Sequence, residues 1–208
     1  MDVVIHMHLN SKNIALLFPS TIDWDNWKLY KSHEPFSEDI IDFLNALSIS
    51  LFNDSQCRAY PDIVTFAFFC RKANLQKLKQ QYARDTNAIR VSRGILFHIA
   101  PSNVPVNFGY SLVAGLLSGN YNVVRVSSKS FTQVDIIVAH LHQLTNIVKW
   151  KEMTNRIVLV QYEKSSDATD YFSSFCETVC GGINCDKKNQ IIDNGAICAC
   201  IGDSRVRG

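Results

Sequence analysis

The 208-residue sequence predicts an α/β fold in three layers, with a parallel sheet between two layers of helices and a helical N-terminal segment. Short apolar runs alternate with helical patterns over residues 90–162, in the order strand, helix, strand, helix, strand. The connections between successive runs are about 20 and 30 residues long, which suits right-handed crossovers between parallel strands.

The composition is that of a globular protein and excludes several classes of function. The sequence is 47% hydrophobic and 19% charged, and its formal net charge of +2 is too balanced for a nucleic-acid binder. Its apolar runs are far shorter than the roughly 18–20 residues that cross a bilayer. The N-terminus also lacks the pattern of a secretory signal. We therefore expect a cytoplasmic protein with no membrane span and no nucleic-acid partner.

Strands followed by helices are predicted for the first part of the chain. Residues 3–9 alternate in polarity and residues 14–18 form an apolar run, and both patterns are typical of strands. From Ser37 onward, apolar residues recur every three or four positions, which predicts a helix with Ser37 as its N-cap. Pro61 is well suited to the first position of a second helix, which we expect to run to about Tyr82.

The middle of the chain carries the pattern of the predicted sheet. The expected strands and helices are, in order, 94–100, about 105–117, 122–126, 131–148 and 157–160. Gly119 is the expected stop of the first of these helices. Ser130 and Gln133 have the spacing of a capping box at the start of the second.

We expect three regions along the chain. Residues 1–88 form the N-terminal strand and helix segment, residues 89–175 form the α/β domain, and residues 176–208 form a divergent tail. The tail contains five of the seven cysteines: Cys176, Cys180, Cys185, Cys198 and Cys200. Without a secretory signal, free thiols are favoured over disulfides. The cysteines lack the C-x2-C spacing of structural zinc, so we expect no metal site there. A relocated nucleophile among them is the alternative to free thiols.

The histidines give no stronger metal signal. His140 and His142 lie two positions apart on a predicted helix, so they face different directions and cannot share an ion. His98 falls within the first predicted strand of the domain, where a core residue is expected.

Two loops should lie at the edge of the sheet where ligands bind, beyond the carboxyl ends of the strands. They are residues 101–104 and 127–130. The phosphate-binding pattern G-x-G-x-x-G is missing after the first strand. Asn103 stands there instead, and two interpretations remain open. Its amide can donate to a developing oxyanion, or its side chain can cap the following helix.

The second loop combines cationic and hydroxyl side chains. Arg125, Ser127, Ser128 and Lys129 follow one another with no acidic residue among them. A carboxylate at this place accepts hydrogen bonds from a ribose 2′-hydroxyl, whereas cations and hydroxyls accommodate a 2′-phosphate. The loop therefore favours NADP(H). The alternative is a salt bridge of Arg125 at the end of the strand and a plain helix cap by the serines.

Three segments carry a resemblance to a known family: RGILFHIAPSNVPVNF at 93–108, GLLSGN at 115–120 and VVRVSSK at 123–129. They resemble the long-chain acyl-CoA reductase family, the fatty-acid reductase component of bacterial bioluminescence and its relatives. This family is a branch of the aldehyde dehydrogenase superfamily. Residues 60–74 also resemble the helix that precedes the nucleotide domain there. The likeness covers about 35–175, and it implies an aldehyde dehydrogenase-like nucleotide-binding fold.

The resemblance implies NADPH-dependent reduction of a long-chain acyl-CoA to a fatty aldehyde through a covalent acyl-enzyme. It assigns Asn103 to the oxyanion. It assigns to the cofactor the residues Ala100, Pro101, Ser102, Arg125, Ser127, Ser128 and Lys129. NAD-preferring members often carry Glu where this chain has Ser128. Implied partners are an acyl-CoA or acyl-protein donor, subunits of a fatty-acid reductase complex and a second copy of the chain.

The chain also departs from the family. Family members are longer, and their nucleophilic cysteine lies in a second, catalytic domain, further beyond the second-strand motif than the residues that follow Lys129 here. Gly181-Gly182 resembles the paired glycines that follow the fourth strand, although the flanking residues differ. We therefore expect the nucleophile and the catalytic domain to be absent and the activity impaired. The alternative is an inactive nucleotide-binding remnant, or an interaction subunit of a reductase complex.

Overall fold

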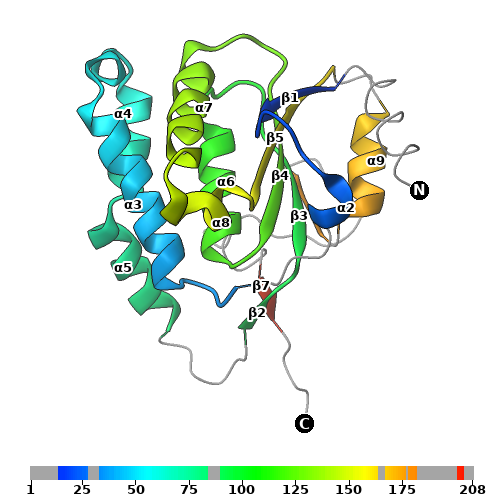
Figure 1. The fold of residues 1–208 in the computed structure, drawn as a ribbon, viewed down its shortest axis with the longest axis horizontal. Coiled ribbons are helices and arrows are strands. Elements are labelled where there is room, and N and C mark those ends of the chain that lie inside the picture. Colours follow the sequence, from blue (N-terminus) through cyan, green and yellow to red (C-terminus); the bar gives the residue numbers. More distant parts are fainter. Residues whose placement is uncertain are drawn as a thin grey trace.

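The structure is a computed structural model that describes residues 14–27, 33–83, 90–163, 167–176, 178–181 and 201–203. It confirms the α/β fold class, with helices on both faces of a central sheet (Figure 1). The strand predicted at 3–9 lies outside the described residues.

Five strands form the main sheet: β1 (Ala15–Phe18), β3 (Ile95–Ile99), β4 (Tyr121–Val126), β5 (Ile157–Gln161) and β6 (Thr178–Gly181). Their order across the sheet is β1-β5-β4-β3-β6. The pairs β4–β5, β3–β4 and β3–β6 are parallel, as predicted, whereas β1 pairs antiparallel with β5 at one edge. Two short strands, β2 (Arg90–Ser92) and β7 (Ile201–Asp203), form a separate antiparallel pair.

The helices of the described residues follow in chain order. They are α2 (Trp24–Trp27), α3 (Glu38–Asn53), the 3₁₀ helix η1 (Ser55–Ala59), α4 (Pro61–Phe69), α5 (Lys72–Tyr82), α6 (Asn107–Leu117), α7 (Thr132–Thr145), the 3₁₀ helix η2 (Val148–Trp150), α8 (Lys151–Thr154) and α9 (Ala168–Phe175). None of them is long and apolar enough to cross a membrane.

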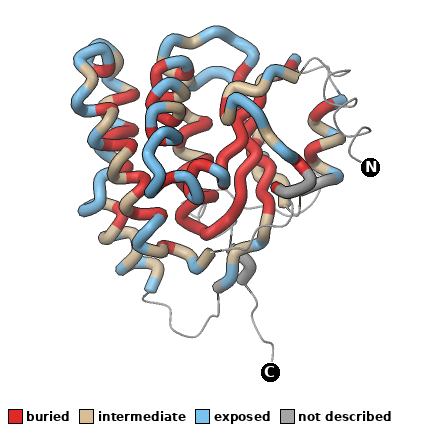
Figure 2. The backbone as a smooth tube through the Cα atoms, in the orientation of Figure 1, coloured by how far each residue is buried: buried red, intermediate tan, exposed pale blue. Residues whose placement is uncertain are grey.

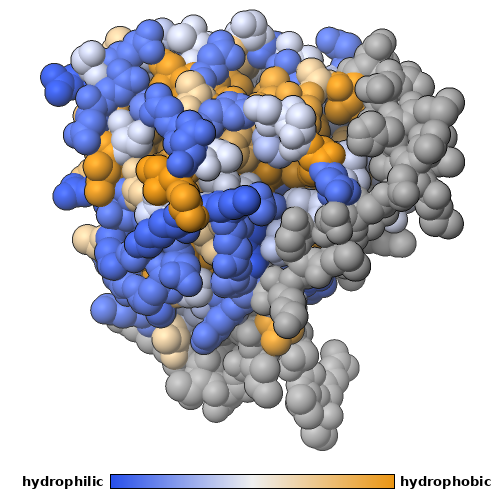
Figure 3. Space-filling model, in the orientation of Figure 1, coloured by the Kyte–Doolittle hydropathy of each residue, from blue (hydrophilic) through white to orange (hydrophobic). Residues whose placement is uncertain are grey.

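Two apolar cores lie on opposite faces of the sheet. The larger joins α3, α4, α6 and α7 to one face, and the smaller places α2 and α9 against the other. The central strands are therefore buried on both sides (Figure 2), as a parallel sheet between two helical layers requires. Figure 3 shows hydrophobic side chains among the hydrophilic ones over the helical layer. Ile49 and Phe52 on α3 and Phe68 on α4 are exposed there.

The N-terminal segment shares this architecture with the predicted domain. Strand β1 extends the sheet beside β5, and α3 packs against both α6 and α7. At the other end, the first residues of the predicted tail form β6, which lies beside β3. One sheet thus takes strands from all three regions that the sequence distinguishes.

The helix predicted from Pro61 to Tyr82 is interrupted, and this expectation of one continuous helix is wrong. Helix α4 ends with Cys70 as its C-cap, and Arg71 adopts an extended backbone with ψ 139° before α5 begins. The amide oxygen of Asn45, on α3, accepts a hydrogen bond of 2.8 Å from the backbone N–H of Lys72. This tertiary contact satisfies a free donor at the start of α5, and no local pattern signals it.

The capping box predicted at Ser130 is also wrong. Helix α7 has Phe131 as its N-cap, without a side-chain hydrogen bond. The amide of Gln133 donates instead to Asp62 Oδ2 at 3.1 Å, which ties α7 to α4.

Two other predicted helix ends are found where expected. Ser37 is the N-cap of α3 as predicted, although its side chain makes no capping hydrogen bond. Gly119 follows α6 with φ +80°, as expected of a glycine that ends a helix.

A buried polar pair lies between α6 and the sheet. The imidazole of His98 on β3 donates from Nε2 to Asn122 Oδ1 on β4 at 3.0 Å, and both residues are buried. Gly115 on α6 leaves the space that the pair occupies, because a Cβ at this position would lie 1.8 Å from Asn122 Oδ1. The prediction of His98 as a core residue is confirmed.

We expect His98 to make stability depend on pH. Burial lowers the pKa of His98 from 6.5 to about 4. Between these values the unfolded chain binds a proton that the folded chain does not, so stability should fall as pH decreases, at up to about 1.4 kcal/mol per pH unit. Denaturant unfolding from pH 7 to 4 measures this slope. The non-titrating variant His98→Gln should show a shallower slope, and an identical slope would contradict the assignment.

Candidate functional site

The two predicted ligand-binding loops leave the sheet side by side. The parallel register pairs Ile99 at the end of β3 with Arg125 near the end of β4. Beyond this pair, the backbone N–H of Ala100 donates to the carbonyl of Arg125 at 3.3 Å. Residues 101–104 and 127–130 therefore begin at the same carboxyl edge of the sheet, as expected from the strand order.

The first loop presents its polar residues to solvent. Ala100 is buried, whereas Pro101, Ser102 and Asn103 are exposed. Helix α6 begins only at Asn107, with Val106 as its N-cap, so the interpretation of Asn103 as the cap of this helix is wrong. Asn103 thus has an exposed amide on a turn at the edge of the sheet, and its oxyanion role remains a prediction.

The second loop has a buried anchor and an exposed tip. Ser127 is buried, and its hydroxyl accepts a hydrogen bond of 3.1 Å from the backbone N–H of Lys129. The carbonyl of Ser127 accepts a second one, of 2.5 Å, from Gln161 Nε2 on β5. Ser128 and Lys129 are exposed. Ser127 therefore shapes the turn, while the next two side chains face solvent with one hydroxyl and one positive charge.

Arg125 is buried, in contrast to Ser128 and Lys129 of the second loop. It is 8% exposed, and its guanidinium lies over the ring of Tyr162 with 4.9 Å to the centroid. Nη2 donates to the Tyr162 carbonyl at 3.2 Å, while Nε is buried without a hydrogen-bond partner. Among the described residues, no carboxylate pairs with Arg125, so the alternative of a salt bridge finds no support. The Arg125 guanidinium is thus a positive charge below the second loop, and its Nε–H is free to donate a hydrogen bond.

The described cysteines fall into two groups. Cys57 and Cys70 are buried in the helical layer, where burial raises the pKa of each thiol. Cys176 follows α9, and Cys180 lies on β6 in register with His98. Cys185, Cys198 and Cys200 lie outside the described residues.

Strand β6 was missed by the sequence-based predictions. Thr178-Val179-Cys180 is a short alternating segment, and the signal beside it is the glycine pair 181–182, whose first member ends the strand. Gly181 aligns with Ile99, so β6 ends at the same edge as β3. This brings the start of the cysteine-rich tail to the candidate site.

A second polar cluster was also missed, because its members are distant in sequence. Asp54, Cys57 and His140 place one ligand atom each within 4.8 Å of one another. Hydrogen bonds from the Gln56 backbone and from His140 lower the pKa of Asp54. His142 bonds elsewhere, to the carbonyl of Leu17, so the two histidines face different directions, as their spacing predicts.

A surface hollow of about 450 Å³ lies over the helical layer. Its lining residues are Asn45, Ser48, Ile49, Phe52, Asn53 and Arg71. None of them belongs to the two edge loops, so the hollow is separate from the candidate site.

Comparisons with known proteins give a family match over more than half of the chain. The model of the acyl-CoA reductase (LuxC) family matches residues 32–173. No curated protein matches the sequence. Among solved structures, proline utilization A (PutA) from Bdellovibrio bacteriovorus, inactivated by N-propargylglycine, is 17% identical with a TM-score of 0.44. An NAD-dependent benzaldehyde dehydrogenase from Corynebacterium glutamicum is 14% identical with a TM-score of 0.43.

The matched region is a small part of both solved structures. The alignment with PutA covers 70% of this chain and 16% of the other, and the alignment with the benzaldehyde dehydrogenase covers 71% and 35%. The family match includes both edge loops and the strands that carry them.

Proposed function

Because this chain belongs to the acyl-CoA reductase (LuxC) family, we propose that it binds NADPH at the carboxyl edge of its sheet and takes part in reducing long-chain fatty acyl-CoA to fatty aldehyde. The observation that carries the proposal is the juxtaposition of the two loops 101–104 and 127–130 at one edge, within the family match. Bound there, NADPH would supply the hydride for the reduction.

The residues present fit a 2′-phosphate. Ser128 and Lys129 offer an exposed hydroxyl and an exposed cation, and no acidic side chain stands between residues 125 and 130 to repel a phosphate. Arg125 adds a buried positive charge whose Nε has no hydrogen-bond partner. We assign these three side chains, with Ser127 as the anchor of the turn, to recognition of the phosphorylated ribose.

The first loop would serve the reacting end of the cofactor and the acyl group. Ala100, Pro101 and Ser102 follow β3 directly and would contact the cofactor from that side of the edge. The exposed amide of Asn103 would donate a hydrogen bond to the oxyanion formed when the thioester carbonyl is attacked. One such donor contributes about 3–4 kcal/mol to the transition state in a preorganised site.

A covalent acyl-enzyme needs a thiolate close to this edge. Cys57 and Cys70 do not meet this need, because both thiols are buried in the helical layer and burial raises their pKa. Cys176, after α9, and Cys180, on β6, lie closer to this edge. The resemblance implies that the nucleophile belongs to a separate catalytic domain, so our proposal for the described residues is limited to binding the cofactor and the oxyanion.

Incubation with NADPH and a long-chain acyl-CoA tests the proposal. We expect NADPH to quench protein fluorescence on binding, and the loss of NADPH absorbance to be slow or absent until a second polypeptide supplies the nucleophilic cysteine. Binding without turnover under both conditions would favour the alternative function, an inactive nucleotide-binding remnant or interaction subunit. Failure to bind NADPH would contradict both the proposal and an inactive nucleotide-binding remnant.

A further inference from the structure

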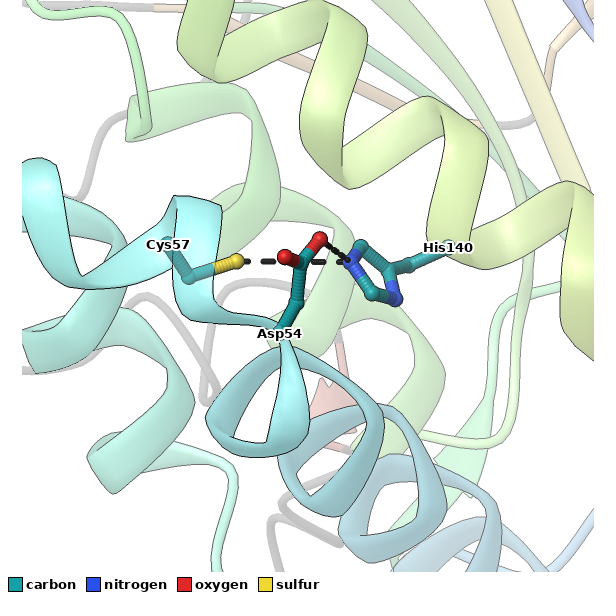
Figure 4. Close-up of side chains that lie close together, drawn as sticks. All are labelled: Asp54, Cys57 and His140. Carbon is teal, nitrogen blue, oxygen red and sulfur yellow. Dashed lines mark hydrogen bonds and ion pairs between the residues drawn. The ribbon is translucent and has the colours of Figure 1, made fainter.

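Three side chains from different elements converge at the Asp54–Cys57–His140 cluster (Figure 4). Asp54 is the residue between α3 and η1, Cys57 belongs to η1, and His140 lies on α7. His140 and Cys57 are buried, whereas the side chain of Asp54 is 32% exposed. The cluster therefore opens to solvent on the Asp54 side, which gives a small ligand a path of entry.

The carboxylate and the thiol approach the same atom of the imidazole. Asp54 Oδ2 lies 3.1 Å and Cys57 Sγ lies 4.0 Å from His140 Nε2. In a tetrahedral zinc site, bond lengths of about 2.0–2.3 Å place neighbouring ligand atoms about 3.3–3.6 Å apart. The three atoms all lie within 4.8 Å of one another, so small side-chain adjustments would bring them to that spacing.

The other imidazole nitrogen already has a hydrogen-bond partner. Ser50 Oγ, on α3, lies 2.6 Å from His140 Nδ1. Here Nε2–H donates to Asp54 Oδ2, and a bound ion would take the place of that proton. Nδ1–H would then donate to Ser50 Oγ, and the lone pair of Nε2 would point toward the ion. Histidines that bind metals are commonly oriented in this way, by a hydrogen bond from the nitrogen that does not bind the ion.

The same geometry argues against a catalytic triad. In a triad the acid holds one imidazole nitrogen and the nucleophile contacts the other. Here the acid and the thiol share Nε2, while a serine occupies Nδ1. A thiolate at buried Cys57, next to the negative charge of Asp54, requires a cation to offset both charges.

We propose that Asp54, Cys57 and His140 bind one Zn²⁺ ion, with a fourth position open to solvent on the Asp54 side. One sulfur, one imidazole nitrogen and one carboxylate oxygen form a donor set that suits zinc better than Mg²⁺ or Ca²⁺, which prefer oxygen alone. The ion would join the α3–η1 corner to α7 and so brace the helical layer. This site is independent of the proposed reductase function.

Cobalt spectroscopy of the full chain tests the proposal, after treatment with a chelator and titration with Co²⁺. We expect one equivalent to produce tetrahedral d–d bands and a thiolate-to-cobalt absorption, both lost on addition of Zn²⁺. Cys57→Ala should abolish the thiolate absorption, whereas the matched control Cys70→Ala, another buried cysteine of the helical layer, should retain it. Persistence of the band in Cys57→Ala would overturn the proposal, because a tail cysteine would then bind the ion.

Two further variants keep the test decisive if Cys57→Ala does not fold. Ser50→Ala removes the hydrogen bond to Nδ1 but no ligand, and it should weaken Zn²⁺ binding about 10–100-fold in competition with a chromophoric chelator. His142→Gln, on the same helix but bonded to the Leu17 carbonyl, should leave the affinity unchanged. Unchanged affinity in folded Ser50→Ala, or no Zn²⁺ binding by the wild-type chain, would overturn the proposal.

Discussion

Replacing Gly115 by alanine should lower the free energy of unfolding by about 3–5 kcal/mol, because the change combines overpacking with the loss of a buried hydrogen bond. The new Cβ would lie 1.8 Å from Asn122 Oδ1 and 2.8 Å from His98 Nε2. Both side chains are buried and hydrogen-bonded to each other, so neither can move aside without losing its partner. The better helix propensity of alanine offsets only about 1 kcal/mol of this loss.

Denaturant unfolding followed by circular dichroism measures the effect of Gly115→Ala. Ser111→Ala is the matched control on α6, because the hydroxyl of Ser111 donates within the helix, to the carbonyl of Asn107. The control should change stability by less than about 1 kcal/mol. A comparably small effect of Gly115→Ala would show that α6 does not pack closely over the His98–Asn122 pair.

The second large effect is expected from Ser128→Glu, which should weaken NADPH binding at least about tenfold and NADH binding much less. The new carboxylate would repel a 2′-phosphate and accept hydrogen bonds from a ribose 2′-hydroxyl. Ser128 is exposed, so the substitution should not affect folding. Parallel fluorescence titrations with the two cofactors give the ratio of their dissociation constants.

Ser130→Glu is the matched control for Ser128→Glu, since Ser130 is an exposed serine of the same loop outside the predicted cofactor contacts. A general electrostatic effect of the added charge would weaken NADPH binding to the same extent in both variants. Equal weakening of NADPH and NADH by Ser128→Glu would count against its assignment to the phosphorylated ribose.

The structure also explains why Arg125→Glu is a poorer test of the same loop. Arg125 is nearly buried, and its guanidinium packs on Tyr162 and donates to the Tyr162 carbonyl. A glutamate there would place an unpaired carboxylate in a poorly hydrated position, which is costly in itself. Loss of cofactor binding in this variant would therefore mix recognition with folding.

The sheet was predictable because its signal is local. The apolar runs at 94–100, 122–126 and 157–160 are typical of strands buried on both faces, and the structure places β3, β4 and β5 there. The parallel order then brings the two loops to one edge without further information. This edge is the part of the candidate site that follows from sequence alone.

The features that were missed depend on contacts between distant residues. At the break between α4 and α5, the backbone N–H of Lys72 bonds to Asn45 on α3, and Gln133 of α7 bonds to Asp62 on α4 rather than capping its own helix. Likewise, His140 meets Asp54 and Cys57 only because α7 packs against α3 and η1. No spacing within one segment signals such a cluster.

Equilibrium titration of the wild-type chain with NADPH and with NADH measures whether the edge formed by β3 and β4 holds a phosphorylated dinucleotide beside Ser128, Lys129 and Arg125. We expect saturable binding of NADPH, at least about tenfold tighter than that of NADH, from the favourable charge-assisted contacts to the phosphate. Equal affinity for the two cofactors, or tighter binding of NADH, would contradict this proposal.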